Sequence, residues 1–200
     1  MKITLITVGK IKERFFEDAI AEYSKRLSRY CKLEIIQVAD EKTPDGASEN
    51  VERQIKEKEG QRILAQIREG AYVIALAIEG KMLSSEELAG KMQKLGVEGK
   101  GHLVFVIGGS LGLSKEVMDR ADHALSFSKM TFPHQLMRVI LQDTLRIRDP
   151  HLRQNFRCPL SCLLFGEICM KTDSLDHLLV NPHCRVQTAH RLLKDHTHLS

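Results

Sequence analysis

The sequence lacks any long hydrophobic run. No stretch of the 200-residue chain approaches the roughly 18 apolar residues that a membrane-spanning helix needs. The N-terminus, MKITLITVGKIKER, has an apolar run too short for the core of a signal peptide, and no small-residue cleavage site follows it. From these two absences we expect a cytoplasmic protein that makes no membrane contact.

A strong excess of charge of one sign is also absent. The chain has 30 Lys and Arg residues and 26 Asp and Glu residues, which gives a formal net charge of +4 and a pI near 8.8. Proteins that bind nucleic acid through electrostatics usually gather basic residues on one face. This mild excess permits an anionic partner such as RNA but does not require one.

Common catalytic and nucleotide-binding motifs are missing as well. The glycine loop IGGSLGLS, at 107–114, has neither the G-x-G-x-x-G spacing nor the Gly-Lys-Ser/Thr ending of a P-loop. No Ser/His/Asp or Cys/His set can be assigned, and Cys31 stands alone at the start of a predicted strand, where we expect a structural role. Acidic residues fall mostly on predicted helices, which is typical of solvated faces.

What the sequence does contain is a regular alternation of apolar runs and amphipathic stretches. Short apolar, β-branched runs predict strands at 2–8, 32–39, 72–78, 102–110 and 123–127. Apolar residues at helical spacing and capping signals predict helices at 11–30, 49–68 (with Gly60 as a candidate interruption), 84–95, 114–121 and from Pro133 onward. This order predicts an α/β fold with a mostly parallel sheet and helices on both faces.

Ligands of open α/β sheets bind outside the carboxyl ends of the strands, where the loops 76–81, 108–113 and 127–132 are predicted to lie. The glycine loop is either a tight turn that needs positive φ or close backbone approach, or a flat surface for an adenosine group. The segment FSKMTFPHQLMR, at 127–138, combines uncommitted backbone groups with apolar side chains. That mixture is typical of a small-cofactor pocket, although an ordinary loop before a helix is the alternative.

Five segments carry a family resemblance through their order and spacing: MKITLITVGKIKE, KEGQRIL, ALAIEGKMLSSEELA, FVIGGSLGLS and ALSFSKMTFPHQLMRVIL. Together they closely resemble the ribosomal RNA large subunit methyltransferase H family, small bacterial SPOUT methyltransferases that act on pseudouridine in 23S ribosomal RNA. The resemblance covers about residues 1 to 145. It implies an α/β domain with a C-terminal trefoil knot, an exception to the usual rules of chain connectivity, a homodimer, and S-adenosylmethionine bound in the knot.

The resemblance also implies functional residues. Matched position by position, the cofactor contacts are expected from Leu76, Gly108, Phe127, Ser128, Lys129, Met130, Thr131 and Phe132. The reaction would methylate N3 of a pseudouridine in structured 23S rRNA, and this nitrogen must first lose its proton. His134 and Arg138 lie one helical turn apart and are the candidates for accepting that proton or stabilising the anion. No metal is expected at this site.

The sequence leaves the family pattern after Leu141. The family ends in a short tail bearing Tyr-His, which we expect to help shape the active site, whereas no tyrosine follows Tyr72 here. Asp149-Pro150 should end the last helix. We therefore expect a SPOUT methyltransferase domain at 1–149 and an atypical, poorly ordered tail at 150–200.

Three interpretations of the tail remain open. The first is zinc binding by Cys158, Cys162, Cys169, His177, His183 and Cys184, although these spacings fit no compact Cys-x2-Cys knuckle. The second is a genuine accessory domain. The third is a C-terminus replaced by a frameshift, which the scattered Cys, His, Leu and Arg favour. In that case the cofactor pocket survives while catalysis is impaired, and the chain would be a cofactor- or RNA-binding protein.

Overall fold

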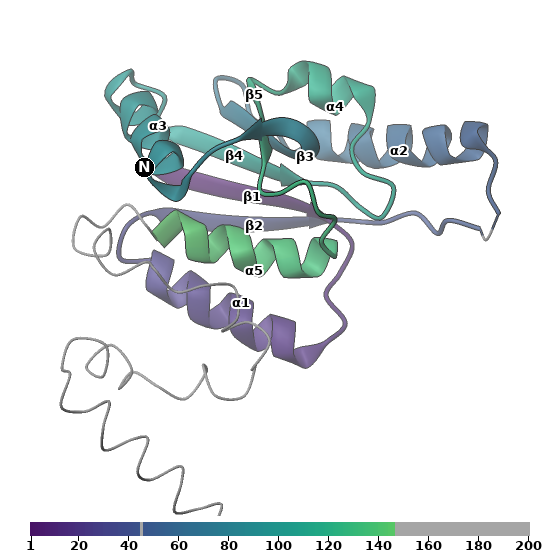
Figure 1. Cartoon of the computed structure of the whole chain (residues 1–200), viewed down its shortest axis with the longest axis horizontal. Coiled ribbons are helices and arrows are strands. Elements are labelled where there is room, and N and C mark those ends of the chain that lie inside the picture. The colour runs from purple at the N-terminus through teal and green to yellow at the C-terminus, as the bar shows by residue number, and fades with distance from the viewer. Residues whose placement is uncertain (45, 147–200) are drawn as a thin grey trace, which may run out of the picture. The chain divides into compact units, whose positions relative to one another are not determined.

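The computed structural model describes residues 1–44 and 46–146, in which strands and helices alternate (Figure 1). The strands are β1 (Lys2–Val8), β2 (Lys32–Val38), β3 (Tyr72–Met82), β4 (His102–Ile107) and β5 (His123–Ser126). The helices are α1 (Arg14–Leu27), α2 (Glu49–Leu64), α3 (Ser85–Val97), α4 (Lys115–Arg120) and α5 (His134–Leu145). The order of elements predicted from the sequence is confirmed. The tail predicted at 150–200 lies outside the described residues.

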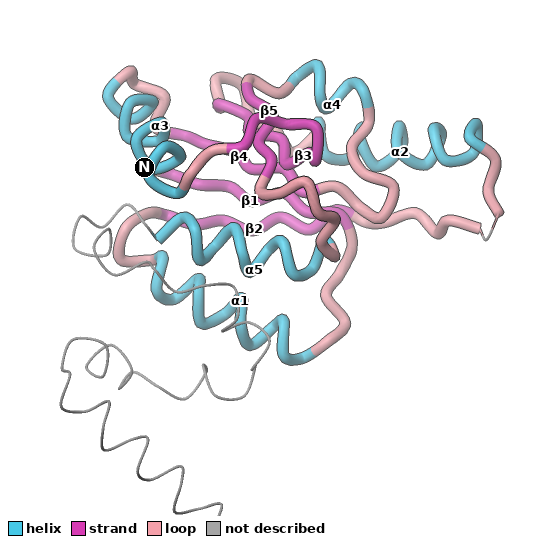
Figure 2. The backbone as a smooth tube through the Cα atoms, in the orientation of Figure 1, coloured by secondary structure: helices cyan, strands magenta, loops and turns pink. Residues whose placement is uncertain are grey.

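The strands form one sheet in the order β2-β1-β4-β3-β5 (Figure 2). Each pairing between these five strands is parallel. The predicted α/β class with a parallel sheet is therefore confirmed. The pairing of β3 with β5 shifts register between Leu76 and Lys81. The trefoil knot implied by the family resemblance stays a prediction.

Helices cover both faces of the sheet, as predicted. Along β4, Leu103, Phe105 and Ile107 pack in one core cluster, while Val104 and Val106 pack in the other. The first cluster also contains buried residues of α1, α3 and α5, and the second contains buried residues of α2 and α4. Strands buried on both faces are mostly apolar, which explains the apolar runs of β4 and of the first part of β3, while β1 also buries Thr4 and Thr7.

Helix starts follow local capping chemistry. Ser84 and Glu87 form the predicted capping box, with Ser84 Oγ accepting from the Glu87 backbone N at 3.1 Å and the Ser84 backbone N donating to Glu87 Oε2 at 2.7 Å. Ser114 Oγ accepts from the Val117 backbone N at 3.4 Å at the start of α4. Pro133 directly precedes α5 at its N-cap position, one residue earlier than the sequence predicts.

The sequence misplaces the end of α2 and the end of β3. Helix α2 stops at Leu64, and β3 continues to Met82. Helix α2 continues through Gly60 without interruption. The glycine is needed for packing, since a Cβ built there would lie 2.2 Å from Ser114 Oγ. The glycine therefore allows α2 to approach the start of α4 closely.

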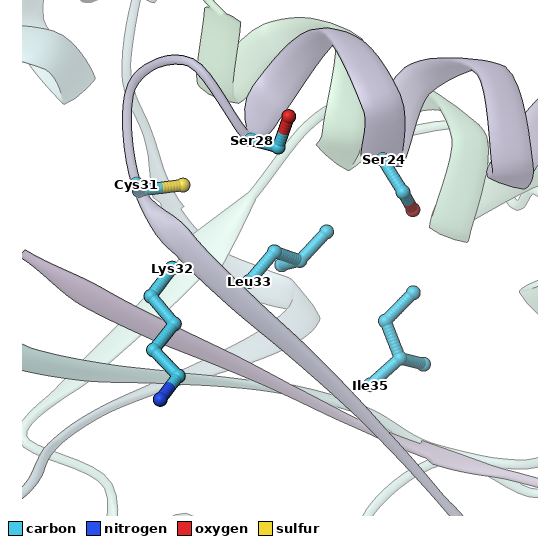
Figure 3. Close-up of a pocket in the computed structure, with 6 residues that line it drawn as sticks. All are labelled: Ser24, Ser28, Cys31, Lys32, Leu33 and Ile35. Carbon is cyan, nitrogen blue, oxygen red and sulfur yellow. The ribbon is translucent and has the colours of Figure 1, made fainter.

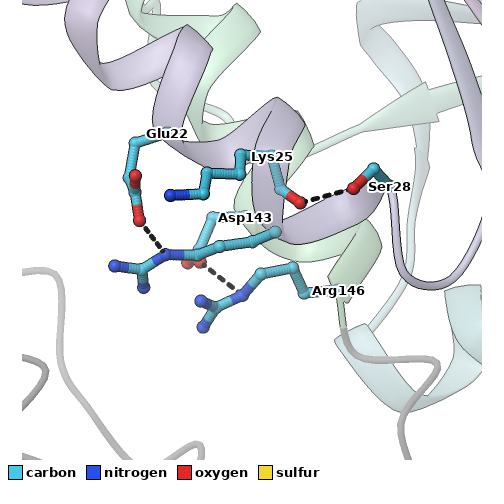
Figure 4. Close-up of polar contacts among 6 residues, drawn as sticks. Glu22, Lys25, Ser28, Asp143 and Arg146 are labelled. Atoms are coloured by element: carbon cyan, nitrogen blue, oxygen red, sulfur yellow. Dashed lines mark hydrogen bonds and ion pairs between the residues drawn. The ribbon is translucent and has the colours of Figure 1, made fainter.

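Helix α5 lies beside α1, and a hydrogen bond joins their C-terminal halves. Figure 4 shows the polar contacts within each helix near these ends, among them Asp143 with Arg146. Ser24 Oγ donates to Gln142 Oε1 at 3.2 Å. Near the end of α5, Arg146 Nε lies 3.4 Å from Asp143 Oδ1, and burial raises the pKa of that carboxyl although the guanidinium opposes the rise. The bond between Ser24 and Gln142 therefore attaches the C-terminal half of α5 to α1.

Candidate active site

A cavity of about 800 Å³ opens at the carboxyl ends of β4 and β5, beside the middle of β3 where its pairing with β4 ends. Leu76, Ile107 and Ser126 contribute to its lining from these three strands, and the loops that follow β4 and β5 supply most of the rest. This is where open parallel sheets bind ligands, and the volume is within the range of small-cofactor sites.

The glycine loop after β4 forms one wall of the cavity. The Gly112 backbone N donates to the Gly109 carbonyl at 3.2 Å, and Gly112 has a φ of +88°, which an L side chain rarely adopts. A Cβ at Gly108 would lie 2.8 Å from the backbone of Gly112. The interpretation as a tight turn therefore holds, and the same glycines present bare backbone to the cavity.

Helix α2 supports this loop from the other side. Glu59 is buried, and its Oε1 accepts from the Glu41 backbone N at 3.0 Å. A Cβ at Gly109 would lie 3.0 Å from Glu59 Oε2. Burial raises the pKa of Glu59, and the nearby Asp40 adds to the rise, although the bond from Glu41 opposes it. The sequence missed this support because an acidic residue in a charged helix resembles a solvated one; its place in the KEGQRIL motif was the available signal.

The segment from Phe127 to Phe132 belongs to neither helix nor strand and also contributes to the lining of the cavity. Ser126 Oγ donates to the Ser128 carbonyl at 3.0 Å, and Ser128 Oγ accepts from the Met130 backbone N at 3.0 Å. The structure places every predicted cofactor residue in the cavity lining except Lys129, whose side chain is exposed. Their contact with a cofactor stays a prediction.

The structure separates the two predicted catalytic residues. His134 is half-buried and lines the cavity. Burial lowers the pKa of its imidazole, the Arg138 charge lowers it further, and Asp40 and Glu13 partly oppose the shift. A neutral imidazole, able to accept a proton, is therefore the favoured form at neutral pH.

Arg138 is not among the residues that line the cavity. Its side chain is only 1% exposed, and its Nη2 donates to the carbonyls of Val8 and Gly9 at 2.7 and 2.8 Å. The spacing of one turn puts both residues on one side of α5, as the sequence indicates, but the guanidinium extends to the carboxyl end of β1.

A second hollow, of about 450 Å³, lies between the end of α1 and the start of β2 (Figure 3). It is lined by Ser24, Ser28, Cys31, Lys32, Leu33 and Ile35. Cys31 is buried there and its Sγ lies 3.7 Å from the Leu27 carbonyl, a weak thiol hydrogen bond of the structural kind. This hollow is distant in the fold from the carboxyl ends of the strands, so it does not compete as the candidate site.

Residues 1–44 and 46–146 contain no group of three or more His, Cys, Asp or Glu side chains placed to hold a metal ion. The cysteines and histidines of the zinc interpretation lie outside those residues. Across the same ranges, the helices are too short or too polar to cross a membrane.

The chain is similar to several known proteins. Residues 1–145 match the family described as "Predicted SPOUT methyltransferase". The "Ribosomal RNA large subunit methyltransferase H" of Bifidobacterium adolescentis is 67% identical over 143 residues, which cover 72% of this chain and 90% of that protein. The protein of the same name from Clostridium novyi is 64% identical over 143 residues, which again cover 72% of this chain and 90% of that protein. A probable methylase family protein from Haemophilus influenzae Rd KW20 aligns with a TM-score of 0.45 and 14% identity, over 82% of this chain and 74% of that one.

Proposed function

The chain belongs to the SPOUT methyltransferase family, and from this premise we propose that it methylates N3 of a pseudouridine in 23S ribosomal RNA with S-adenosylmethionine as the methyl donor. The observation that carries the proposal is the cavity itself. The two loops that bear the most specific family motifs, 108–113 and 127–132, both contribute to its lining. A ribosomal substrate also implies a cytoplasmic protein.

The residues of the cavity fit S-adenosylmethionine. Gly108 and Gly112 leave a wall of bare backbone on which a flat adenine ring can lie. Leu76 and Phe132 supply apolar surface, and the irregular backbone of 127–132 offers polar groups that belong to no ladder. When bound, the cofactor supplies a methyl group made electrophilic by its sulfonium.

His134 is the residue of the cavity wall best suited to the proton on N3. Its imidazole lines the cavity and is held in the neutral form by burial and by the Arg138 charge. A neutral imidazole within hydrogen-bond reach of N3 can accept the proton as the nitrogen becomes a nucleophile. Beyond this proton transfer, the cavity would contribute by holding the target nitrogen in line with the methyl group and the sulfur of the cofactor.

A homodimer would complete the site. Ile78, Met82 and Met130 are 54%, 53% and 70% exposed, and Ile78 and Met130 also line the cavity. Large apolar side chains gathered at the rim of a cavity are typical of an interaction surface. We propose that a second copy of the chain covers this rim; sedimentation of the wild type against Ile78→Asp tests it, and a wild-type monomer would contradict it.

A second candidate function is cofactor and RNA binding without turnover. The observation that favours it is the absence of any tyrosine after Tyr72, because the family's terminal Tyr-His segment is replaced. The cavity residues named above all precede the replaced segment, so cofactor binding is expected under both candidates.

The experiment that tests the proposal has two steps on the full chain. Calorimetry measures binding of S-adenosylmethionine, and a second assay measures methyl transfer to ribosomes that lack the modification. Binding with transfer supports the methyltransferase. Binding without transfer supports the second candidate, and the absence of binding contradicts both.

A further inference from the structure

Helix α5 carries two polar side chains on its buried face, one turn apart. Arg138 is 1% exposed and bonds through Nη2 to the carbonyls of Val8 and Gly9. Gln142 is fully buried and accepts from Ser24 Oγ on α1. The two residues therefore attach the same helix to different parts of the fold, Arg138 to the end of β1 and Gln142 to α1.

Burial of the charged Arg138 side chain costs free energy, because the guanidinium loses its hydration. Desolvation lowers the pKa of its guanidinium, and within the described residues its Nε and Nη1 atoms are buried without a hydrogen-bond partner. Well-packed apolar side chains often stabilise such a position more than an incompletely paired charge does. Stability alone is therefore a poor explanation for an arginine at this position.

The two bonds of Arg138 fix a specific junction. On one side, Gly9 has a φ of +80° and its backbone N donates to the Val38 carbonyl at 2.9 Å, so it marks the turn where β1 leaves the sheet. On the other side, the first turn of α5 brings Pro133, His134 and Met137 to the cavity. Arg138 is the described side chain that hydrogen-bonds this turn of α5 to the β1 end.

We propose that Arg138 is a positioning residue, which fixes the first turn of α5 against the carboxyl end of β1 and so holds His134 and Met137 in the cavity wall. The inference rests on the proposed function in taking the cavity as the cofactor site. Arg138 itself touches neither cofactor nor substrate in this role.

The position of the guanidinium has an electrostatic consequence for His134. The charged groups that act on its imidazole come from three segments: Arg138 from α5, Asp40 from the end of β2, and Glu13 from the start of α1. Removal of the Arg138 cation leaves the two carboxylates unopposed. The pKa of His134 should then rise, and a larger fraction of the imidazole should be protonated near neutral pH.

The test compares Arg138→Met, Arg138→Lys and the matched control Gln142→Met, all in the full chain. Gln142→Met also removes a buried polar contact of α5, but one that leads to α1 and away from the cavity. For each folded variant, calorimetry gives the Kd of S-adenosylmethionine, and NMR gives the pH titration of the His134 ring.

Arg138→Met should weaken cofactor binding at least about fivefold, because small displacements of positioned groups have large effects, and should raise the pKa of His134. Gln142→Met should change neither beyond about twofold. Arg138→Lys keeps the charge but not the fork of donors, so it should leave the His134 titration close to wild type and weaken binding by an intermediate factor.

A folded Arg138→Met protein with wild-type Kd and wild-type His134 titration would overturn the inference. If that variant does not fold, Arg138→Lys decides: unchanged cofactor binding in it overturns the inference, and weaker binding supports it. If the wild-type chain binds no cofactor, the proposed function fails separately, and a wild-type His134 titration in folded Arg138→Met would still overturn the role of Arg138.

Discussion

Gly108→Ala gives a direct test of the cavity wall. A Cβ at this position would lie 2.8 Å from the backbone carbon and oxygen of Gly112, about 0.6 Å closer than ordinary van der Waals contact, which begins at 3.4 Å. The neighbours are backbone atoms of a closed turn, so they cannot rotate away as a flexible side chain could. Overpacking of this kind typically costs about 1–3 kcal/mol.

Because Gly108 and Gly112 both line the cavity, part of this strain should appear as weaker cofactor binding. A strain of about 1–3 kcal/mol expressed fully in binding corresponds to roughly 5- to 150-fold in Kd. Isothermal titration with S-adenosylmethionine measures that change, and thermal unfolding measures the strain that remains in the fold.

The matched control is Gly90→Ala. Gly90 is exposed in α3 and a Cβ there meets no atom within 4 Å, so this variant should keep wild-type binding and gain about 0.5–1 kcal/mol of stability. The reasoning is refuted if Gly108→Ala binds the cofactor and unfolds as the wild type does.

Three further changes test the surrounding structure. Gly60→Ala should lower the free energy of unfolding by about 1–3 kcal/mol despite alanine's better helix propensity, and Ser114→Gly in the same chain should relieve the clash with Ser114 Oγ; equal urea midpoints for single and double variants would contradict this. Ser84→Ala should cost about 1 kcal/mol by removing the N-cap of α3, and an unchanged urea midpoint would speak against the cap. Burial raises the pKa of Glu59, so its contribution to stability is present below the unfolded pKa of 4.5 and is lost as pH rises through the folded pKa. Glu59→Gln should therefore be more stable than wild type at pH 7 and equal to it below about pH 4, and thermal melts that show the same difference at both pH values would contradict the assignment.

Much of the fold could be predicted because its central strands, β1, β4 and the first part of β3, are buried on both faces. A continuous apolar run such as the one in β4 differs from the pattern of an amphipathic helix, so the strand can be recognised from the sequence alone. Ser84 and Ser114 marked helix starts because capping is a local interaction. The end of α2 and the extension of β3 depend on packing between distant segments, which the pattern of one segment does not contain.

In the candidate site, too, features set by neighbouring residues could be predicted, whereas those set by contacts between distant segments could not. The two motif loops were identified from their residues, and the parallel sheet brings them together. The burial of Glu59 and the direction of the Arg138 side chain could not be predicted, because each depends on which element lies opposite the helix. Spacing along α5 places Arg138 near His134 but does not reveal that β1 ends beneath it.

The central claim is that this chain is a methyltransferase of ribosomal RNA, and transfer of a labelled methyl group tests it most directly. The full chain is incubated with S-adenosylmethionine labelled in its methyl group and with ribosomes that lack the modification, and the 23S RNA is then digested to nucleosides. The account predicts label on N3 of a pseudouridine, with less label for His134→Ala. Unlabelled 23S RNA from a reaction in which the chain demonstrably binds the cofactor would contradict it.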